Sequence, residues 1–158
     1  NDPHSFTISC DNVTVGVFTD IGRPCDQLIY HFKKCHAAFL ESNYDEDMLE
    51  NGRYPIHLKN RIRGGHGHLS NREALELFTQ HRPTFMSHLV LSHLSKENNS
   101  PELAAGLFSK HAGNTSIIVA SRYKATEVYN VTASSGFEVN AAPYQARRAK
   151  PMQLGLFD

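Results

Sequence analysis

Polar residues that could hold a metal ion or move a proton follow three apolar runs of this 158-residue sequence. Asp20 ends "VGVFTD", Glu41 ends "AAFLE" and His93 ends "LVLSH". Carboxylates and imidazoles together hold divalent ions, and a histidine kept off the metal and paired with a carboxylate can protonate a leaving group. If the three runs are strands of one α/β sheet, their carboxyl ends share an edge where ligands usually bind. The pattern predicts a hydrolytic metal centre at that edge.

A glycine-rich stretch, "GGHGHLSN", adds His66 and His68 just before an expected helix. Its flexible backbone would let an imidazole reach the same edge of the sheet. A metal ion held there would lower the pKa of a bound water and polarise a phosphoryl or carbonyl oxygen.

Each of these features also has an ordinary structural explanation. Asp20 could be a turn or helix-cap residue, a histidine at a strand end is more often not a ligand, and the glycine-rich stretch could be only a connector. Asp45, which begins "DED", fits the first turn of a helix, where the helix dipole favours acidic side chains. The spacing alone therefore leaves the metal centre open.

Composition is that of an ordinary globular domain, apart from ten histidines. The formal net charge is zero, so any basic surface has to be local. The cysteines, Cys10, Cys25 and Cys35, are odd in number and lack a paired short spacing, which argues against a disulfide framework or zinc finger and favours a reducing, cytoplasmic setting. Neither a membrane span nor a signal peptide is predicted.

Strand and helix patterns alternate along the chain, which predicts an α/β fold. Ser70 and Glu73 form a capping box at the start of one helix, and Pro101 occupies the first position of another. Strands are predicted over 5–10, 13–20, 37–42, 85–93, 115–123 and 127–131, and helices over 22–35, 45–52, 54–65, 69–81 and 100–113, the third of these ending at a glycine pair.

Four stretches carry a family resemblance: "VFTDIG", "LESNYDEDMLENGRYPIHLKNRI", "GHLSN" and "LSHLSKENNSPELA". In this order they resemble the C-terminal half of metallo-β-lactamase-fold hydrolases, in the YycJ-like branch, and more distantly tRNase Z. The resemblance covers roughly residues 5–132. It implies an αββα sandwich of two sheets flanked by helices, with residues 1–132 forming the second half of the fold and residues 133–158 an extended tail.

The resemblance also implies a function and roles for single residues. Asp20 matches the aspartate that bridges two metal ions, zinc or manganese, and His93 matches the last metal-binding histidine. His68 matches the histidine that protonates the leaving group, with Glu41 or Asp45 as its carboxylate partner. The implied activity is that of a metal-dependent phosphodiesterase, an exonuclease acting on nucleic acid in DNA repair.

The sequence departs from the family pattern in ways that matter. The His-x-His-x-Asp-His signature, which supplies most of the metal ligands, is absent, and Tyr44 stands where relatives often have histidine. We therefore expect an incomplete fragment that lacks the N-terminal half of the fold and is inactive alone. Two alternatives stay open: hydrolysis of a small phosphodiester or thioester, and a non-catalytic interaction module.

The last residues of the chain, "QLGLFD", place apolar groups after a polar tail. Such a segment either folds back onto its own domain or docks into a partner. It resembles the motif with which bacterial replication and repair proteins bind the sliding clamp. The residues that would make this contact are Gln153, Leu154, Leu156 and Phe157.

Overall fold

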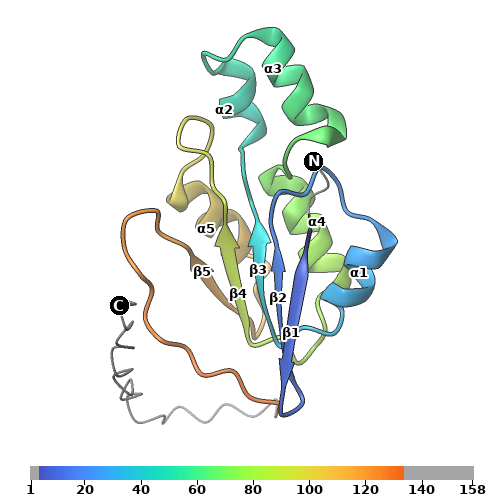
Figure 1. Ribbon diagram of the computed structural model, residues 1–158. Coiled ribbons are helices and arrows are strands. Elements are labelled where there is room, and N and C mark those ends of the chain that lie inside the picture. The colour runs from blue at the N-terminus through green and yellow to red at the C-terminus, as the bar shows by residue number, and fades with distance from the viewer. Residues whose placement is uncertain (1–3, 134–158) are drawn as a thin grey trace, which may run out of the picture.

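A computed structural model of the chain describes residues 4–133, and the termini, 1–3 and 134–158, lie outside this described part. It contains a five-stranded sheet in which the strands stand in chain order (Figure 1). The strands are β1 Phe6–Cys10, β2 Val13–Phe18, β3 Ala37–Glu41, β4 His88–Ser92 and β5 Ser116–Val119. The helices are α1 Asp26–Phe32, α2 Glu46–Asn51, α3 Ile56–Arg61, the π-helical turn η1 Ile62–His66, α4 Asn71–His81 and α5 Pro101–Ser109.

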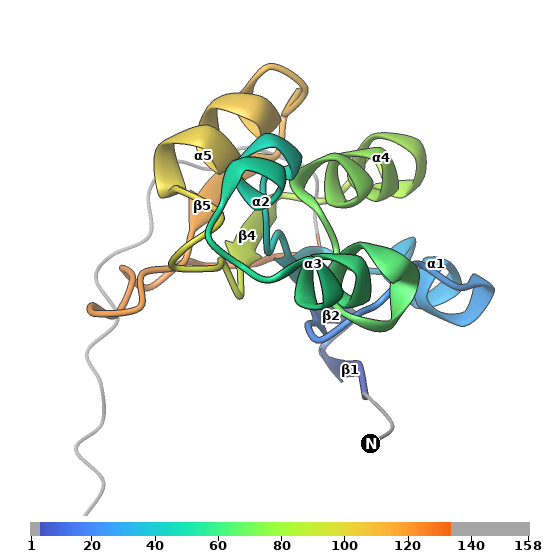
Figure 2. The same cartoon turned by 90° about the horizontal axis from the view of Figure 1, so that it is seen from above.

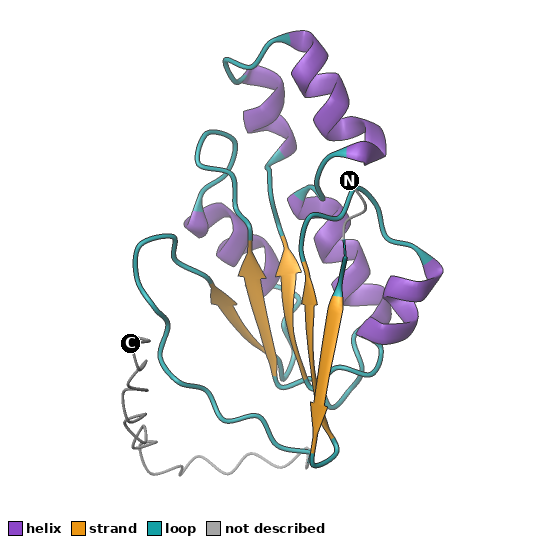
Figure 3. Cartoon of the chain, viewed as in Figure 1, coloured by secondary structure: helices purple, strands orange, loops and turns teal. Residues whose placement is uncertain are grey.

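The sheet is mixed, as Figure 3 shows. β1 and β2 form an antiparallel hairpin, and its turn residues Asp11 and Asn12 have φ angles of 47° and 65°. Aspartate and asparagine tolerate this left-handed conformation, which suits a tight hairpin turn. β2, β3, β4 and β5 are parallel, and their crossovers run through helices. The α/β architecture predicted from the sequence is confirmed.

The hydrophobic core lies between one face of the sheet and three helices. Figure 2 shows α1, α4 and α5 on the same side of the sheet. Phe18, Leu40 and Leu91 pair in register across β2, β3 and β4 and point into this core, where each is at most 1% exposed. Burying a side chain of this size stabilises the fold by about 1.5–3 kcal/mol.

The opposite face of the sheet carries an apolar row that is only partly covered, since Val90 in β4 is buried and other members are exposed. One row across all five strands consists of Phe6, Val17, Phe39, Val90 and Ile118. Phe6 is 61% exposed and Phe39 is 40% exposed. Parallel strands usually have both faces covered, so an open row of this composition is unusual for this kind of sheet.

The segment between β3 and β4 rises above the carboxyl ends of the parallel strands (Figure 1). It begins at α2, which Asp45 caps, and ends at α4, where Ser70 and Glu73 form the predicted capping box. The prediction that a glycine pair ends the intervening helix is confirmed. Helical backbone runs from α3 into η1 and breaks at Gly65, whose φ of 76° is left-handed and is adopted by glycine without strain.

Three predictions need correction. The predicted strand 127–131 is not a strand, and the one predicted over 115–123 is limited to β5. Residues 127–131 do not pair with the open edge of β5 or with another described strand, and Val128 is 73% exposed. The helix predicted over 22–35 is also shorter, because it begins at Asp26. Within residues 4–133, no helix is both long and apolar enough to cross a bilayer.

Candidate metal centre

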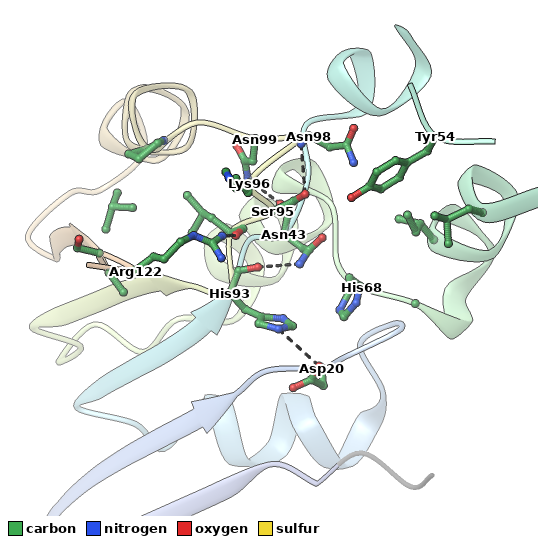
Figure 4. Close-up of a pocket in the computed structure, with 18 of the residues that line it drawn as sticks. Asp20, Asn43, Tyr54, His68, His93, Ser95, Lys96, Asn98, Asn99 and Arg122 are labelled. Atoms are coloured by element: carbon green, nitrogen blue, oxygen red, sulfur yellow. Dashed lines mark hydrogen bonds and ion pairs between the residues drawn. The ribbon is translucent and has the colours of Figure 1, made fainter. Parts of the chain in front are cut away.

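Asp20, His68 and His93 meet above the carboxyl edge of the sheet (Figure 4). Asp20 follows β2, His93 follows β4, and His68 comes from the loop between η1 and α4. His93 Nε2 lies 3.7 Å from Asp20 Oδ1, and one ligand atom from each of the three residues lies within 4.8 Å of the other two. The predicted proximity of Asp20 and His93 is confirmed.

Glu41 lies beneath this cluster and connects its two histidines. Its side chain is fully buried at the end of β3. Oε1 accepts hydrogen bonds from Nδ1 of both His68 and His93, each at 2.7 Å, and Oε2 accepts one from the backbone N–H of Ile21, also at 2.7 Å. Burial raises the pKa of Glu41, but the hydrogen bonds from His68, His93 and Ile21 outweigh it and leave the pKa below its ordinary value. Glu41 is therefore an ionised carboxylate inside the fold.

The ionised state of Glu41 determines which nitrogen of each imidazole carries the proton. A carboxylate can only accept hydrogen bonds, so Nδ1 of His68 and of His93 must each carry the proton. In the neutral rings Nε2 then keeps its lone pair. The two rings stand edge to face with centroids 5.0 Å apart. A histidine whose Nδ1–H is held by a carboxylate is the usual arrangement around protein-bound metals.

The donor set fits a divalent metal ion. Two imidazole nitrogens and a carboxylate oxygen are ligands that zinc and manganese accept, and catalytic sites with three protein ligands keep a further position open. This is the one group of three such side chains found among residues 4–133. With all three side chains as ligands, the described residues accommodate one ion. With His68 kept off the metal, Asp20 and His93 remain, and further ligands are needed for one ion or for a pair.

The pKa of His93 is raised above its ordinary value in the metal-free protein. The hydrogen bond to Glu41 raises the pKa of His93, and the charges of Glu41 and Asp20 add to this effect. Burial and the nearby guanidinium of Arg122 act in the opposite direction but are weaker. A positive charge on this imidazole is therefore balanced by carboxylates on two sides.

Asp20 and His93 both adopt a left-handed backbone conformation, with φ angles of 59° and 58°. For residues other than glycine this conformation costs on the order of 1 kcal/mol, and such strain gathers at functional sites. The His93 turn is held by Asn43, whose side-chain Nδ2 donates to the His93 carbonyl at 2.7 Å. The backbone thus bends sharply at the two residues that share the cluster.

A buried polar network ties the loops of the site together. Asn71 and Asn99 exchange side-chain hydrogen bonds of 3.0 and 2.8 Å, and Ser42 Oγ donates to Asn71 Oδ1 at 2.6 Å. Asn99 Nδ2 also donates to the Ser42 carbonyl at 2.8 Å. These residues come from the ends of β3, the start of α4 and the loop before α5, so the network fixes the positions of all three segments. Sequence reasoning did not identify it, although each residue lies in a stretch that carries the family resemblance.

The two candidates for the carboxylate partner of His68 lie in different surroundings. Glu41 contacts His68 directly, as described above. Asp45 instead accepts a hydrogen bond of 3.0 Å from the backbone N–H of Met48 and caps α2, in agreement with its interpretation as part of a helical first turn. The structure brings Glu41 and not Asp45 to the cluster.

The cluster opens into a cleft of about 1320 Å³. Apart from histidines and Asp20, the charged residues that line the cleft are all basic: Arg61, Lys96 and Arg122. Figure 4 shows Arg122 and Tyr54 reaching toward the cleft from opposite sides. Of the basic residues, Arg61 and Lys96 lie in stretches that carry the family resemblance. No sequence pattern pointed to Arg122, because it lies in an irregular segment after the edge strand β5.

Comparison with known proteins adds sequence relatives, although no family model matches. The chain is 34% identical over 103 residues to a protein named exodeoxyribonuclease YycJ from Bacillus anthracis, covering 65% of this chain and 39% of that protein. It is 32% identical over 102 residues to one named exodeoxyribonuclease WalJ from Streptococcus pneumoniae, covering 65% and 38%. The predicted similarity to YycJ-like proteins is confirmed, and the chain spans about 39% of the length of these relatives.

Proposed function

We propose that this chain belongs to a metal-dependent hydrolase that cleaves phosphodiester bonds of DNA as an exonuclease. The observation that carries the proposal is the Asp20, His68 and His93 cluster oriented by the buried Glu41 carboxylate. The relatives named exodeoxyribonucleases support the choice of DNA as substrate. The basic lining of the cleft suits a polyanion, and the cleft volume exceeds the roughly 300–1,000 Å³ typical of small-molecule sites.

Each residue of the cluster has a proposed role. Asp20 and His93 would hold the divalent metal, zinc or manganese, in the complete enzyme. Such ions, when bound, polarise the phosphoryl oxygen and lower the pKa of an attacking water. His68 donates a proton from Nε2 to the leaving oxygen, while Glu41 holds its Nδ1 and stabilises the charged ring.

We also propose that the complete enzyme is a metallo-β-lactamase sandwich. The apolar row from Phe6 to Ile118 would then pack against a second sheet, supplied by an N-terminal half that also provides the remaining metal ligands. The length of the relatives supports this proposal. A cysteine introduced as Phe39→Cys should react with a thiol reagent in this chain alone and be protected in the complete protein. Equal labelling in both would contradict the second sheet.

The activity is tested on the complete protein, supplied with zinc or manganese. Labelled DNA, labelled RNA, a chromogenic phosphodiester and a thioester are offered in parallel. We expect hydrolysis of DNA, abolished by Asp20→Ala together with loss of bound metal, and retained by the control Asp45→Asn, which preserves the helix cap. Inactivity on DNA with bound metal would refute the nuclease proposal, and turnover of the thioester alone would replace it.

The tail adds a proposed partner. Gln153, Leu154, Leu156 and Phe157 lie outside the described residues, so this proposal rests on the sequence alone. Binding to the bacterial sliding clamp would hold the nuclease on DNA by effective concentration. A tail peptide should bind the clamp in fluorescence polarisation, and replacement of Leu156 and Phe157 by alanine should abolish binding. Equal signals from both peptides would exclude the interaction.

A further inference from the structure

We propose that Arg122, supported by Lys96, binds a phosphate group of the substrate beside the Asp20, His68 and His93 cluster. This inference rests on the proposed function, since it names how a phosphodiester substrate is held at the same site. Neither basic residue belongs to the proposed catalytic or metal-binding set.

The position of Arg122 is fixed next to the cluster. Its Nη2 donates a hydrogen bond of 2.6 Å to the carbonyl of Leu94, the residue after His93. The backbone N–H of Ala120 donates to the Leu91 carbonyl at 2.8 Å, which anchors the start of the same segment to β4. Figure 4 shows the Arg122 side chain extending over the His93 turn into the cleft.

The guanidinium of Arg122 has capacity left for a ligand. One N–H contacts Leu94, and a guanidinium offers several more in a planar fork that matches two phosphate oxygens. Among residues 4–133, the arginines in ion pairs with carboxylates are Arg63 and Arg72, which pair with Glu50 and Glu46. Arg122 has no such pair within that part of the chain, and it is exposed in a cleft that also contains Lys96.

A structural role alone does not account for this arrangement. Within residues 4–133 the one side-chain hydrogen bond of Arg122 goes to the Leu94 carbonyl, which leaves the remaining N–H groups of the guanidinium for the cleft that Arg122 lines. A phosphate bound between the cluster and Arg122 would satisfy the guanidinium and Lys96 together. The geometry therefore favours an anionic group of the substrate at this end of the cleft.

The test compares Arg122→Gln with Lys124→Gln in the complete protein. Lys124 lies two residues further along the same segment but does not line the cleft, so its variant loses the same charge elsewhere. Binding of a labelled single-stranded oligonucleotide is measured in chelator at several salt concentrations. We expect Arg122→Gln to bind about 10–100-fold more weakly and the slope of log K against log salt to fall by about 0.7. Lys124→Gln should keep the wild-type affinity within about twofold at the highest salt, where a charge away from the bound strand is screened most strongly.

Arg122→Lys separates a phosphate contact from a structural defect. It should restore most of the salt slope but only part of the affinity, because lysine keeps the charge and loses the fork. Equal affinity and slope for wild type and Arg122→Gln would overturn the proposal. If the wild type neither binds nor cleaves DNA, the nuclease function fails, and inorganic phosphate then serves as the probe. Its inhibition of chromogenic phosphodiester turnover should weaken in Arg122→Gln but not in Lys124→Gln, and equal inhibition in both would overturn the site.

Discussion

The substitution Glu41→Gln tests the proposed orienting role of the buried carboxylate. Glutamine has the same shape, but one of its oxygens becomes an amide that donates hydrogen bonds. If the amide nitrogen faces His68 and His93, both rings must accept at Nδ1 and carry their proton on Nε2, which removes the Nε2 lone pair with which His93 would bind a metal. If it faces Ile21 instead, two buried donors oppose each other.

The magnitude follows from the contacts that are lost. Hydrogen bonds to a charged group contribute about 1.5–3 kcal/mol each, and three of them end on Glu41. Part of this stabilisation is kept. In one orientation of the glutamine amide, its oxygen still accepts the hydrogen bond from Ile21. The side chains of His68 and His93 are 31% and 41% exposed, so they can hydrogen-bond to water instead. We therefore expect the metal-free protein to lose about 2–5 kcal/mol of unfolding free energy. Metal affinity should fall about 10–100-fold.

The assay combines denaturant unfolding of the metal-free complete protein with competitive metal titration. Asp45→Asn is the matched control, because Asp45 is the other candidate partner of His68 and asparagine is an equally good N-cap. That variant should keep both stability and metal affinity. Unchanged metal affinity in Glu41→Gln, or a larger effect in Asp45→Asn, would refute the orienting role of Glu41.

The same substitution should change how the stability of the metal-free protein depends on pH. The pKa of Glu41 is lowered in the fold, so its contribution is present above the ordinary carboxyl value of 4.5 and is lost as pH falls through the folded pKa. The pKa of His93 is raised, so its contribution is present below 6.5 and is lost as pH rises through the folded pKa. The stability gap between wild type and Glu41→Gln should therefore narrow at acid pH, and a constant gap would contradict the ionised state of Glu41.

Two further predictions concern His68 and the cysteines. His68→Ala should leave bound metal intact and slow turnover by roughly 10²–10⁴-fold, measured by metal analysis and steady-state kinetics, whereas loss of metal would show that His68 is a ligand. Burial raises the pKa of Cys35 to about 11, so an alkylating reagent at neutral pH should modify the exposed Cys10 and Cys25 in the native chain and spare Cys35. Rapid modification of Cys35, detected by mass spectrometry, would contradict its buried position.

Local sequence patterns determined which elements form and which residues could share a site. Apolar runs ending in Asp20, Glu41 and His93 are short-range signals, and parallel pairing of the strands brings their ends to one edge. The helix starts at Ser70 and Pro101 could be predicted from the sequence, because helix capping depends on residues only a few positions apart.

Other features depend on contacts between residues far apart in the chain, which local patterns do not contain. The choice of Glu41 over Asp45 beside His68 was decided by the depth of β3 in the fold, which buries one carboxylate and leaves the other to cap a helix. The predicted strand 127–131 does not form although its composition favours one, because a strand requires backbone pairing with a neighbour and this segment does not pair with the open edge of β5. Arg122 reaches His93 only because β5 lies beside β4, so its place in the cleft is a property of the tertiary structure alone.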